Sequence, residues 1–354
     1  MYKLLRVLDI LGITSPDGTL PKEIGNLIHL TYLRIRSTNI RKLPKSIGKL
    51  KNLLTLDYWD VFAETEVQVP NVLWKLEKLR HLYLPNEMGG SIEALKLHTL
   101  KDLISLWGVG GGDWTRKEMG RLSSTLSKLY VHRISSKDQL KAVLDCPSMT
   151  ENGCMYALAL EWYGFKMKLD ALSSKQGLRK LRLIGQAPDT SYNHDQLLFP
   201  SNLAKLELYY TKLERPETLS QLGKLVSLKV LKLSKDAYIG TKWCCRKEEF
   251  PALEELKLTS LPQLEDWDIE DGAMPCLKKL SIVSCIKLKR MPEGLMFVHG
   301  LEKLHIENMP TSFSTRHQKI KEYSDEASSE GEDYHITEHI PEVIIQDYSC
   351  ASFR

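Results

Sequence analysis

The sequence predicts an α/β solenoid, a fold in which one short structural unit is repeated along the chain and stacked on itself. A Leu-x-x-Leu-x-Leu pattern recurs through most of the chain, and steps of 23 to 29 residues separate its copies. Leucine-rich repeats have a period of about 20–29 residues. We therefore predict a leucine-rich-repeat solenoid of about thirteen repeats. The middle leucines of the copies are Leu8, Leu33, Leu56, Leu82, Leu106, Leu129, Leu158, Leu181, Leu206, Leu231, Leu256, Leu280 and Leu304.

Each copy of the pattern predicts a short strand, and the clearest copies are residues 30–40, 203–213 and 277–288. Side chains alternate between the two faces of a strand, so the leucines point inward and the residues between them point outward. One repeat cannot bury its own apolar face, but stacked repeats share a continuous core. We expect a horseshoe whose concave side is a parallel sheet.

The segments between the strands predict short convex helices or 3₁₀ turns. Residues 20–27 and 43–50 both read Leu-Pro-x-x-Ile-Gly-x-Leu, and proline favours the first position of a helical turn. Residues 136–144 predict a helix, in which Ser136 and Gln139 have the spacing of a capping box. The weakest repeat ends at Gly108, where the glycine-rich run predicts a flexible turn.

Charge is unevenly distributed along the chain. Residues 1–313 carry 45 basic and 36 acidic side chains, whereas residues 314–354 carry four basic and nine acidic ones. We therefore predict a solenoid over 1–313 and an acidic, partly disordered tail over 314–354, in which residues 338–345 could form a terminal cap. The tail either stays solvated or folds back on the basic body, and the body itself could meet an acidic partner.

The cysteines and the apolar segments predict a protein of the cytoplasm or nucleus. The seven cysteines lack any Cys-x-x-Cys motif and are interpreted as reduced thiols. No run of 18 apolar residues predicts a membrane span, and Arg6 and Asp9 interrupt the apolar N-terminus, which argues against a signal peptide. The first strand has no polar cap before it, which predicts either a further domain ahead of residue 1 or a fragment.

Motifs for catalysis or cofactor binding are not found. The glycine run at 108–112 lacks the phosphate-loop pattern, residues 265–272 do not match the calcium loop of an EF-hand, and no Gly-x-Ser-x-Gly elbow occurs. The histidines are too scattered for a metal site. We therefore expect no cofactor, no metal and no enzymatic activity.

The outward strand positions are the candidate partner-binding residues. Aromatic and arginine side chains are enriched at interface hot spots, and an exposed row of them is costly unless something covers it. The alternative is that neighbouring rings stack on each other and stabilise the sheet. From the eighth repeat onward lysine dominates, but glutamates interrupt it, so nucleic acid is not expected. The predicted binding residues are Tyr32, Arg34, Trp59, Tyr83, Trp107, Tyr130, Trp162, Arg182, Tyr209, Lys232 and Lys257, and replacing Trp107 and Tyr130 by alanine should abolish binding without unfolding.

Several segments carry a resemblance to a known family. Residues 4–10 with 20–33, residues 74–85, and the late segments 264–277, 287–295 and 339–344 resemble plant intracellular nucleotide-binding leucine-rich-repeat immune receptors. Within these receptors the chain is most similar to the coiled-coil class from grasses. The resemblance implies recognition of a pathogen effector or a monitored host protein, and restraint of a nucleotide-binding domain.

The sequence departs from that family in one respect. It contains no coiled coil, no phosphate loop and no Met-His-Asp motif, so the switching and signalling of the family are not carried over. A second interpretation is a protein-interaction scaffold unrelated to immunity, such as the substrate-recruiting arm of a ubiquitin ligase. An F-box-like segment would favour this second interpretation, and none is present in the sequence.

Overall fold

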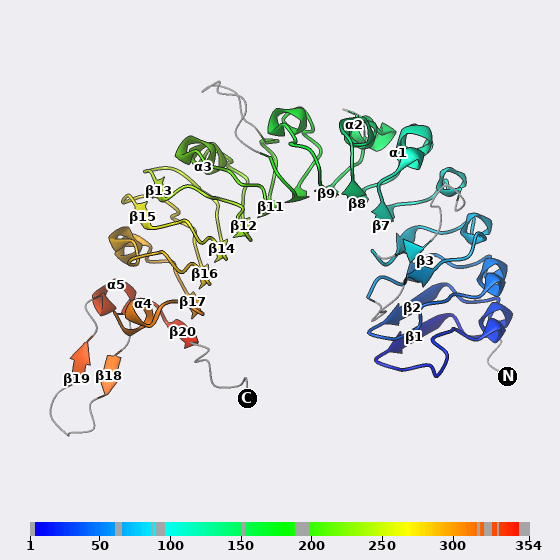
Figure 1. Cartoon of the computed structure of the whole chain (residues 1–354), viewed down its shortest axis with the longest axis horizontal. Helices are drawn as coiled ribbons and strands as arrows, with labels where there is room; N and C mark the ends of the chain where they lie inside the picture. Colours follow the sequence, from blue (N-terminus) through cyan, green and yellow to red (C-terminus); the bar gives the residue numbers. More distant parts are fainter. Residues whose placement is uncertain are drawn as a thin grey trace. The chain divides into compact units, whose positions relative to one another are not determined.

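The computed structural model describes residues 4–60, 66–86, 88–89, 96–150, 153–187, 199–316, 319–321, 328–330 and 333–346. The chain divides into two compact units, Met1–Phe165 and Lys166–Arg354. In each unit a parallel sheet forms one side, and short helices and 3₁₀ turns form the other (Figure 1). The predicted leucine-rich-repeat solenoid is therefore confirmed.

The first unit contains seven parallel strands in the order β1-β2-β3-β5-β7-β8-β9. Its return segments hold α1, α2 and 3₁₀ turns, and a small second sheet pairs β4 with β6. The bounds are β1 Val7–Leu11, β2 Tyr32–Arg36, β3 Thr55–Asp57, β4 Val67–Gln68, β5 His81–Tyr83, β6 Met88–Gly89, β7 Ser105–Gly110, β8 Lys128–Ile134, β9 Ala157–Trp162, α1 Asp113–Glu118 and α2 Lys137–Leu144, with 3₁₀ turns at Lys22–Asn26, Lys45–Lys49, Leu73–Lys75, Leu97–Thr99, Met119–Arg121 and Pro147–Met149.

The second unit also contains seven parallel strands, in the order β10-β11-β12-β14-β16-β17-β20. Two smaller sheets accompany it: β13 pairs with β15 in parallel, and β18 pairs with β19 antiparallel. The bounds are β10 Lys180–Ile184, β11 Lys205–Tyr209, β12 Val230–Ser234, β13 Lys242–Cys245, β14 Glu255–Thr259, β15 Asp266–Ile269, β16 Lys279–Val283, β17 Lys303–Glu307, β18 Lys319–Lys321, β19 Ser328–Glu330, β20 Glu342–Gln346, α3 Pro216–Gly223, α4 Thr311–Arg316 and α5 Tyr334–Thr337, with 3₁₀ turns at Leu169–Leu172 and Glu293–Phe297.

All thirteen middle leucines of the sequence pattern lie in main-sheet strands of the two units. Within each unit the middle leucine of one strand lies opposite that of the next, for example Leu206 between Leu181 and Leu231. Apart from Leu8 on the first strand, these leucines are at most 2% exposed. Each buried leucine contributes roughly 1.5–3 kcal/mol, and these contributions hold the repeats together.

The helix predicted at residues 136–144 is present as α2, with Ser136 as its N-cap. The Ser136 hydroxyl accepts a hydrogen bond from the backbone N–H of Gln139 at 3.3 Å. The Gln139 side chain reaches back and accepts from the backbone N–H of Ser135 at 3.0 Å. The predicted capping pair therefore forms, with its return bond displaced by one residue.

The glycine run does not form the turn that the sequence predicted, because Gly108 lies inside β7. The pairing of β7 with β8 shifts register between Leu106 and Val109, so Gly108 occupies a β-bulge. Its φ is +83°, and a Cβ atom at this position would lie 1.9 Å from the carbonyl oxygen of Leu84. Only glycine fits this close approach of two backbones.

The segment beyond residue 313 supplies the last strand of the second unit. β20 pairs in parallel with β17, so that Val343 lies opposite Leu304 and Ile345 opposite Ile306. In the same region the Arg316 guanidinium donates to both carboxylate oxygens of Asp333, at 2.7 and 3.1 Å. The boundary at 313 and the partial disorder of the tail stay predictions.

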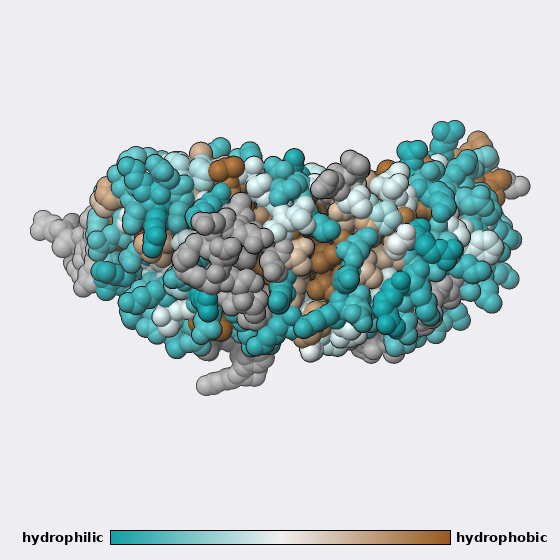
Figure 2. All heavy atoms as spheres, turned by 90° about the horizontal axis from the view of Figure 1, so that it is seen from above, coloured by the Kyte–Doolittle hydropathy of each residue, from teal (hydrophilic) through white to brown (hydrophobic). Residues whose placement is uncertain are grey.

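Hydrophilic residues cover most of the surface on the side that carries the helices, with hydrophobic residues in separate patches (Figure 2). No helix among the described residues is long and apolar enough to cross a membrane. The acidic stretch at 265–272 contributes strand β15, in which Trp267 is buried and stacks on Trp243 of β13 at 5.3 Å. The six cysteines in the described part of the chain are free thiols.

Candidate interaction surface

The open face of each unit is the set of strand side chains that point away from the leucine core. In the first unit its central row begins with Asp9, Arg34, Asp57, Tyr83 and Trp107, which lie opposite one another on β1, β2, β3, β5 and β7. The parity of the strands therefore brings Arg34, Tyr83 and Trp107, three of the predicted binding residues, into one row.

Charged groups at the β1–β3 end of this row are held in two-pronged pairs. Arg34 donates to both carboxylate oxygens of Asp9 at 2.8 and 2.5 Å, and Arg36 donates to both of Asp57 at 2.9 and 2.7 Å. The Arg36 guanidinium also lies 5.0 Å from the centroid of the Trp59 ring, which stays 44% exposed. The exposed Trp59 ring therefore makes a cation–π contact with Arg36, which Asp57 holds in place.

Aromatic side chains form the β5–β8 end of the row. The rings of Trp107 and Tyr130 lie 4.9 Å apart in a tilted arrangement, and the Tyr130 hydroxyl donates to Glu161 at 2.8 Å. Tyr130 is only 6% exposed, whereas Trp107 and Tyr83 are half-buried. Tyr130 is therefore covered by stacking against a neighbouring ring, which was the alternative to partner binding. The expectation that the Trp107 and Tyr130 alanine variant stays folded remains a prediction, and the burial of Tyr130 and its hydrogen bond to Glu161 indicate that the variant would lose stability.

The placement of Trp162 on the open face is also wrong. Trp162 is 3% exposed and lies opposite Ile134 in the pairing of β8 with β9. It stands four residues after the middle leucine Leu158, and residues an even number apart share one side of a strand. Strand parity could therefore have excluded it.

Beside Tyr130 on β8 lies a buried histidine, His132, whose ring centroid is 5.9 Å from that of Tyr130. Its Nε2 atom has no hydrogen-bond partner among the described residues. Burial lowers the pKa of His132, and Arg133 adds to this effect, while Glu161 partly opposes it. Burial, with Lys128 and Arg80, lowers the pKa of His81 on β5 as well.

We expect these histidines to make the fold less stable in mild acid. A histidine in the unfolded chain titrates near its ordinary pKa of about 6.5, whereas the folded chain binds that proton only at lower pH. The contribution of these two histidines to the free energy of unfolding is therefore constant above about pH 6.5. It decreases as the pH falls toward the pKa values of the folded chain. Thermal melts across this range should show a smaller decrease for His132→Gln than for the unchanged chain. An identical decrease in both would contradict the assignment to His132.

The open face of the second unit is dominated by charge. Its central row is Arg182, Glu207, Lys232 and Lys257, followed by Ser281 and His305. Glu207 is 5% exposed and accepts from Arg182 at 2.5 Å, and its other oxygen lies 2.8 Å from the Lys205 ammonium. Burial alone would raise the pKa of Glu207, but Lys205 and Arg182 outweigh it and hold the pKa below its usual value.

The predicted residue Tyr209 is half-buried, with the Arg182 guanidinium 5.3 Å from its ring centroid. Tyr32 also lies at an outward position, on β2. Sequence reasoning placed Glu207 on the outward face only as an interruption of the lysines and missed Asp57, and it assigned neither carboxylate as a partner of these cations. Asp57 follows a middle leucine directly, so the same positional rule that found Tyr83 would have found it.

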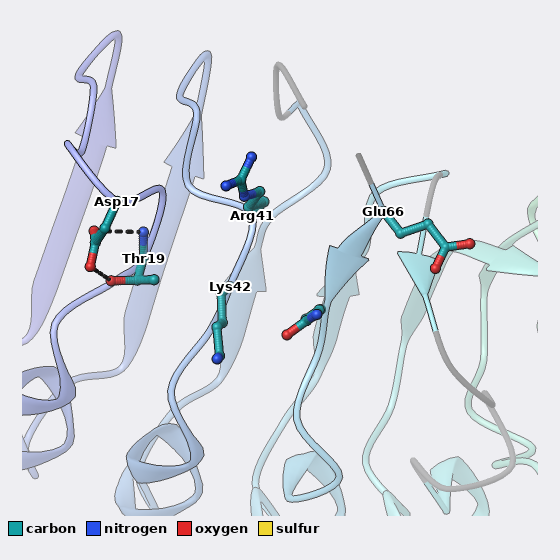
Figure 3. A pocket seen from close by; sticks show the side chains of 6 residues that line it. Asp17, Thr19, Arg41, Lys42 and Glu66 are labelled. Carbon is teal, nitrogen blue, oxygen red and sulfur yellow. Dashed lines mark hydrogen bonds between the residues drawn. The ribbon is translucent and has the colours of Figure 1, made fainter. Parts of the chain in front are cut away.

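A separate cavity of about 570 Å³ lies beside the strands of the first unit (Figure 3). Thr19, Lys42 and Gln68 come from three successive repeats and are joined by isolated parallel bridges. Hydrogen bonds from Thr19 and Ser15 lower the pKa of Asp17 to about 2. None of the predicted binding residues lines this cavity, whose lining is Asp17, Thr19, Arg41, Lys42, Glu66 and Gln68. The mixed charges offer hydrogen bonds and charge pairing to a polar group.

Among the described residues, no group of three or more histidine, cysteine, aspartate or glutamate side chains could hold a metal ion. The open faces of the two units are therefore sets of aromatic, cationic and carboxylate groups placed at regular strand spacing. Such surfaces can stack, pair charges and donate hydrogen bonds to another protein.

The family model of the leucine-rich repeat region matches residues 1–330. The chain belongs to this family. Its relatives include three disease resistance proteins of Arabidopsis thaliana. Disease resistance protein RPP8 is 32% identical over 344 residues, which is 96% of this chain and 36% of the relative. Disease resistance RPP8-like protein 3 is 32% identical and covers 98% of this chain and 36% of its own length. Disease resistance protein RPH8A is 31% identical and covers 96% and 36%.

The chain thus spans about a third of the length of the curated relatives it matches. The predicted resemblance to plant disease resistance receptors is confirmed for the leucine-rich-repeat region, whereas the assignment to the coiled-coil class and to grasses stays a prediction.

Solved structures agree on the fold of this leucine-rich-repeat protein. The functional domain of InlJ from Listeria monocytogenes aligns with a TM-score of 0.52 at 15% identity, covering 97% of this chain and 63% of that one. The internalin InlF from the same species aligns with a TM-score of 0.50 at 14% identity, covering 97% and 82%. At such low identity these alignments bear on the fold alone.

Proposed function

We propose that this chain is the protein-recognition module of a plant innate immune receptor. In this proposal the open face binds a pathogen effector or a monitored host protein inside the cell, and the module restrains a nucleotide-binding domain. The module itself is non-catalytic. The observation that carries the proposal is the alignment with disease resistance proteins along 96% or more of the chain.

The surface chemistry of the first unit supports protein as the ligand. Interface hot spots are enriched in tryptophan, tyrosine and arginine, and they lie where rings are held rigidly. Trp107 is braced by Tyr130, and Trp59 is braced by Arg36. Rings fixed in this way lose little conformational freedom when a partner covers them, so their burial contributes fully to affinity. The free cysteines agree with a reducing compartment.

Replacing Trp107 by alanine is expected to weaken binding of the recognised protein by about 2 kcal/mol or more, roughly thirtyfold in Kd. The partner would first be identified by two-hybrid screening of the full chain against pathogen effectors and host proteins. Affinity would then be measured by titration calorimetry. A melting curve of each variant shows whether the fold is kept.

Trp74→Ala is a matched control, because Trp74 is also half-buried but lies in the 3₁₀ turn Leu73–Lys75 on the opposite side of the repeat. Loss of affinity in Trp107→Ala with full affinity in Trp74→Ala supports recognition through the open face. Equal affinities in both variants would place the interface elsewhere. If the screen yields no effector and no host protein, the receptor proposal itself fails.

A further inference from the structure

The second unit carries more positive charge on its open face than the carboxylates there can neutralise. Glu207 lies among three cationic side chains of this face. Its carboxylate oxygens are 2.5 Å from the Arg182 guanidinium, 2.8 Å from the Lys205 ammonium and 3.8 Å from the Lys232 ammonium. One buried carboxylate thus serves three cations. Lys232 also lies 3.4 Å from Glu255 on the next strand, so this second carboxylate is engaged as well.

Two lysines beyond this network have no ion-pair partner among the described residues. Lys257 lies beside Lys232 in the strand register, and Lys279 lies one strand further, beside Glu255 and Lys303. Lys303 is itself paired with Glu342 at 2.5 Å. Adjacent strands are about 4.8 Å apart, so Lys232 and Lys257 place like charges side by side, which costs stability. Like charges kept together on a sheet face favour an anionic ligand.

The groups around these lysines suit a peptide. Ser281 lies beside Lys257 on β16, and Thr259 shares the outward side of β14. The Thr259 hydroxyl is buried and has no hydrogen-bond partner in the part of the chain that the structure describes. The lysine ammonium groups can pair with the carboxylates of an extended chain, and the Ser281 hydroxyl can donate a hydrogen bond to its backbone.

We propose that the lysine strip of β12, β14 and β16, formed by Lys232, Lys257 and Lys279, binds an acidic, extended segment of a partner protein. The segment crosses the strands, with its carboxylates over Lys257 and Lys279. This inference rests on the proposed function, because it names the chemistry of the partner segment that the open face of the second unit would bind. The lysines select a carboxylate-rich segment by charge complementarity, and the segment needs no aromatic side chain to bind.

The test measures binding of a fluorescein-labelled peptide of alternating glutamate and serine to the full chain by fluorescence anisotropy at low salt. Lys257→Glu with Lys279→Glu is expected to weaken binding by at least about tenfold, because two attractions become repulsions. Binding to the unchanged chain should weaken as salt rises. Lys257→Gln with Lys279→Gln removes the charges without adding new ones, and it should show a smaller loss in the same direction.

The control changes net charge equally at a distance from the strip. Lys45 and Lys49 are exposed in the 3₁₀ turn Lys45–Lys49 of the first unit, so Lys45→Glu with Lys49→Glu should leave peptide affinity nearly unchanged. Equal losses in both charge-reversed pairs would show attraction to net charge and overturn the proposal. Absence of peptide binding would overturn it too, as would tighter binding of single-stranded DNA of the same charge. Trp107→Ala should bind the peptide normally even if it loses its effector.

Discussion

Replacing Leu206 by aspartate is expected to destabilise the second unit by more than about 4 kcal/mol and to abolish its cooperative melting transition. Leu206 is 0% exposed and lies between Leu181 and Leu231 of the neighbouring strands. A carboxylate there would be buried without a cation or a hydrogen-bond donor. Circular dichroism and urea denaturation of the full chain would measure the loss.

Val226→Asp is the matched control, because the same charge is introduced at an apolar position that is 65% exposed. Its melting curve should nearly coincide with that of the unchanged chain. If Leu206→Asp melted like the control, the inward leucines would not be the shared core of the stack.

Replacing Gly108 by alanine is expected to destabilise the first unit by about 3 kcal/mol or more. The added Cβ atom would meet the carbonyl oxygen of Leu84 at 1.9 Å, and φ of +83° is unfavourable for any residue with a side chain. The strand would have to withdraw from β5, and the bulge that leads into β8 would shift. For a unit of this size the melting temperature should fall by roughly 6–12 °C.

Gly120→Ala provides the comparison, since a Cβ atom at Gly120 would have no neighbour within 4 Å. It should change stability by a few tenths of a kcal/mol at most. An equally mild effect of Gly108→Ala would refute the close approach of β7 to Leu84. Because Trp107 precedes Gly108, the same variant should also weaken any partner that contacts the Trp107 ring.

The fold could be predicted from the sequence because the solenoid is built from local, repeated information. The leucines of each repeat show which side of their own strand is inward, and the recurrence of the pattern every 23 to 29 residues indicates that the strands stack in register. This explains why all thirteen middle leucines lie in strands. The sequence also indicated the family, because the motifs in the late repeats resemble those of disease resistance receptors.

The candidate surface was harder to predict, because exposure depends on neighbours that are far away in sequence. Parity separates Trp162 from Trp107 within the sequence itself, because Trp162 stands four residues after its middle leucine and Trp107 directly follows its own. Tyr130 has the correct parity, but the ring of Trp107 and the carboxylate of Glu161 cover it.

By itself the sequence determined the repeat, the inward leucines, the capped helix and the resemblance to disease resistance proteins, because each of these is written in residues that are neighbours along the chain. Only the tertiary structure decided which outward side chains stay exposed for contact with a partner. The bulge at Gly108, the sharing of Glu207 by three cations and the pairing of β20 with β17 all depend on contacts between strands. The physical reason is that backbone approach and charge pairing are set across repeats, whereas the leucine pattern describes each repeat alone.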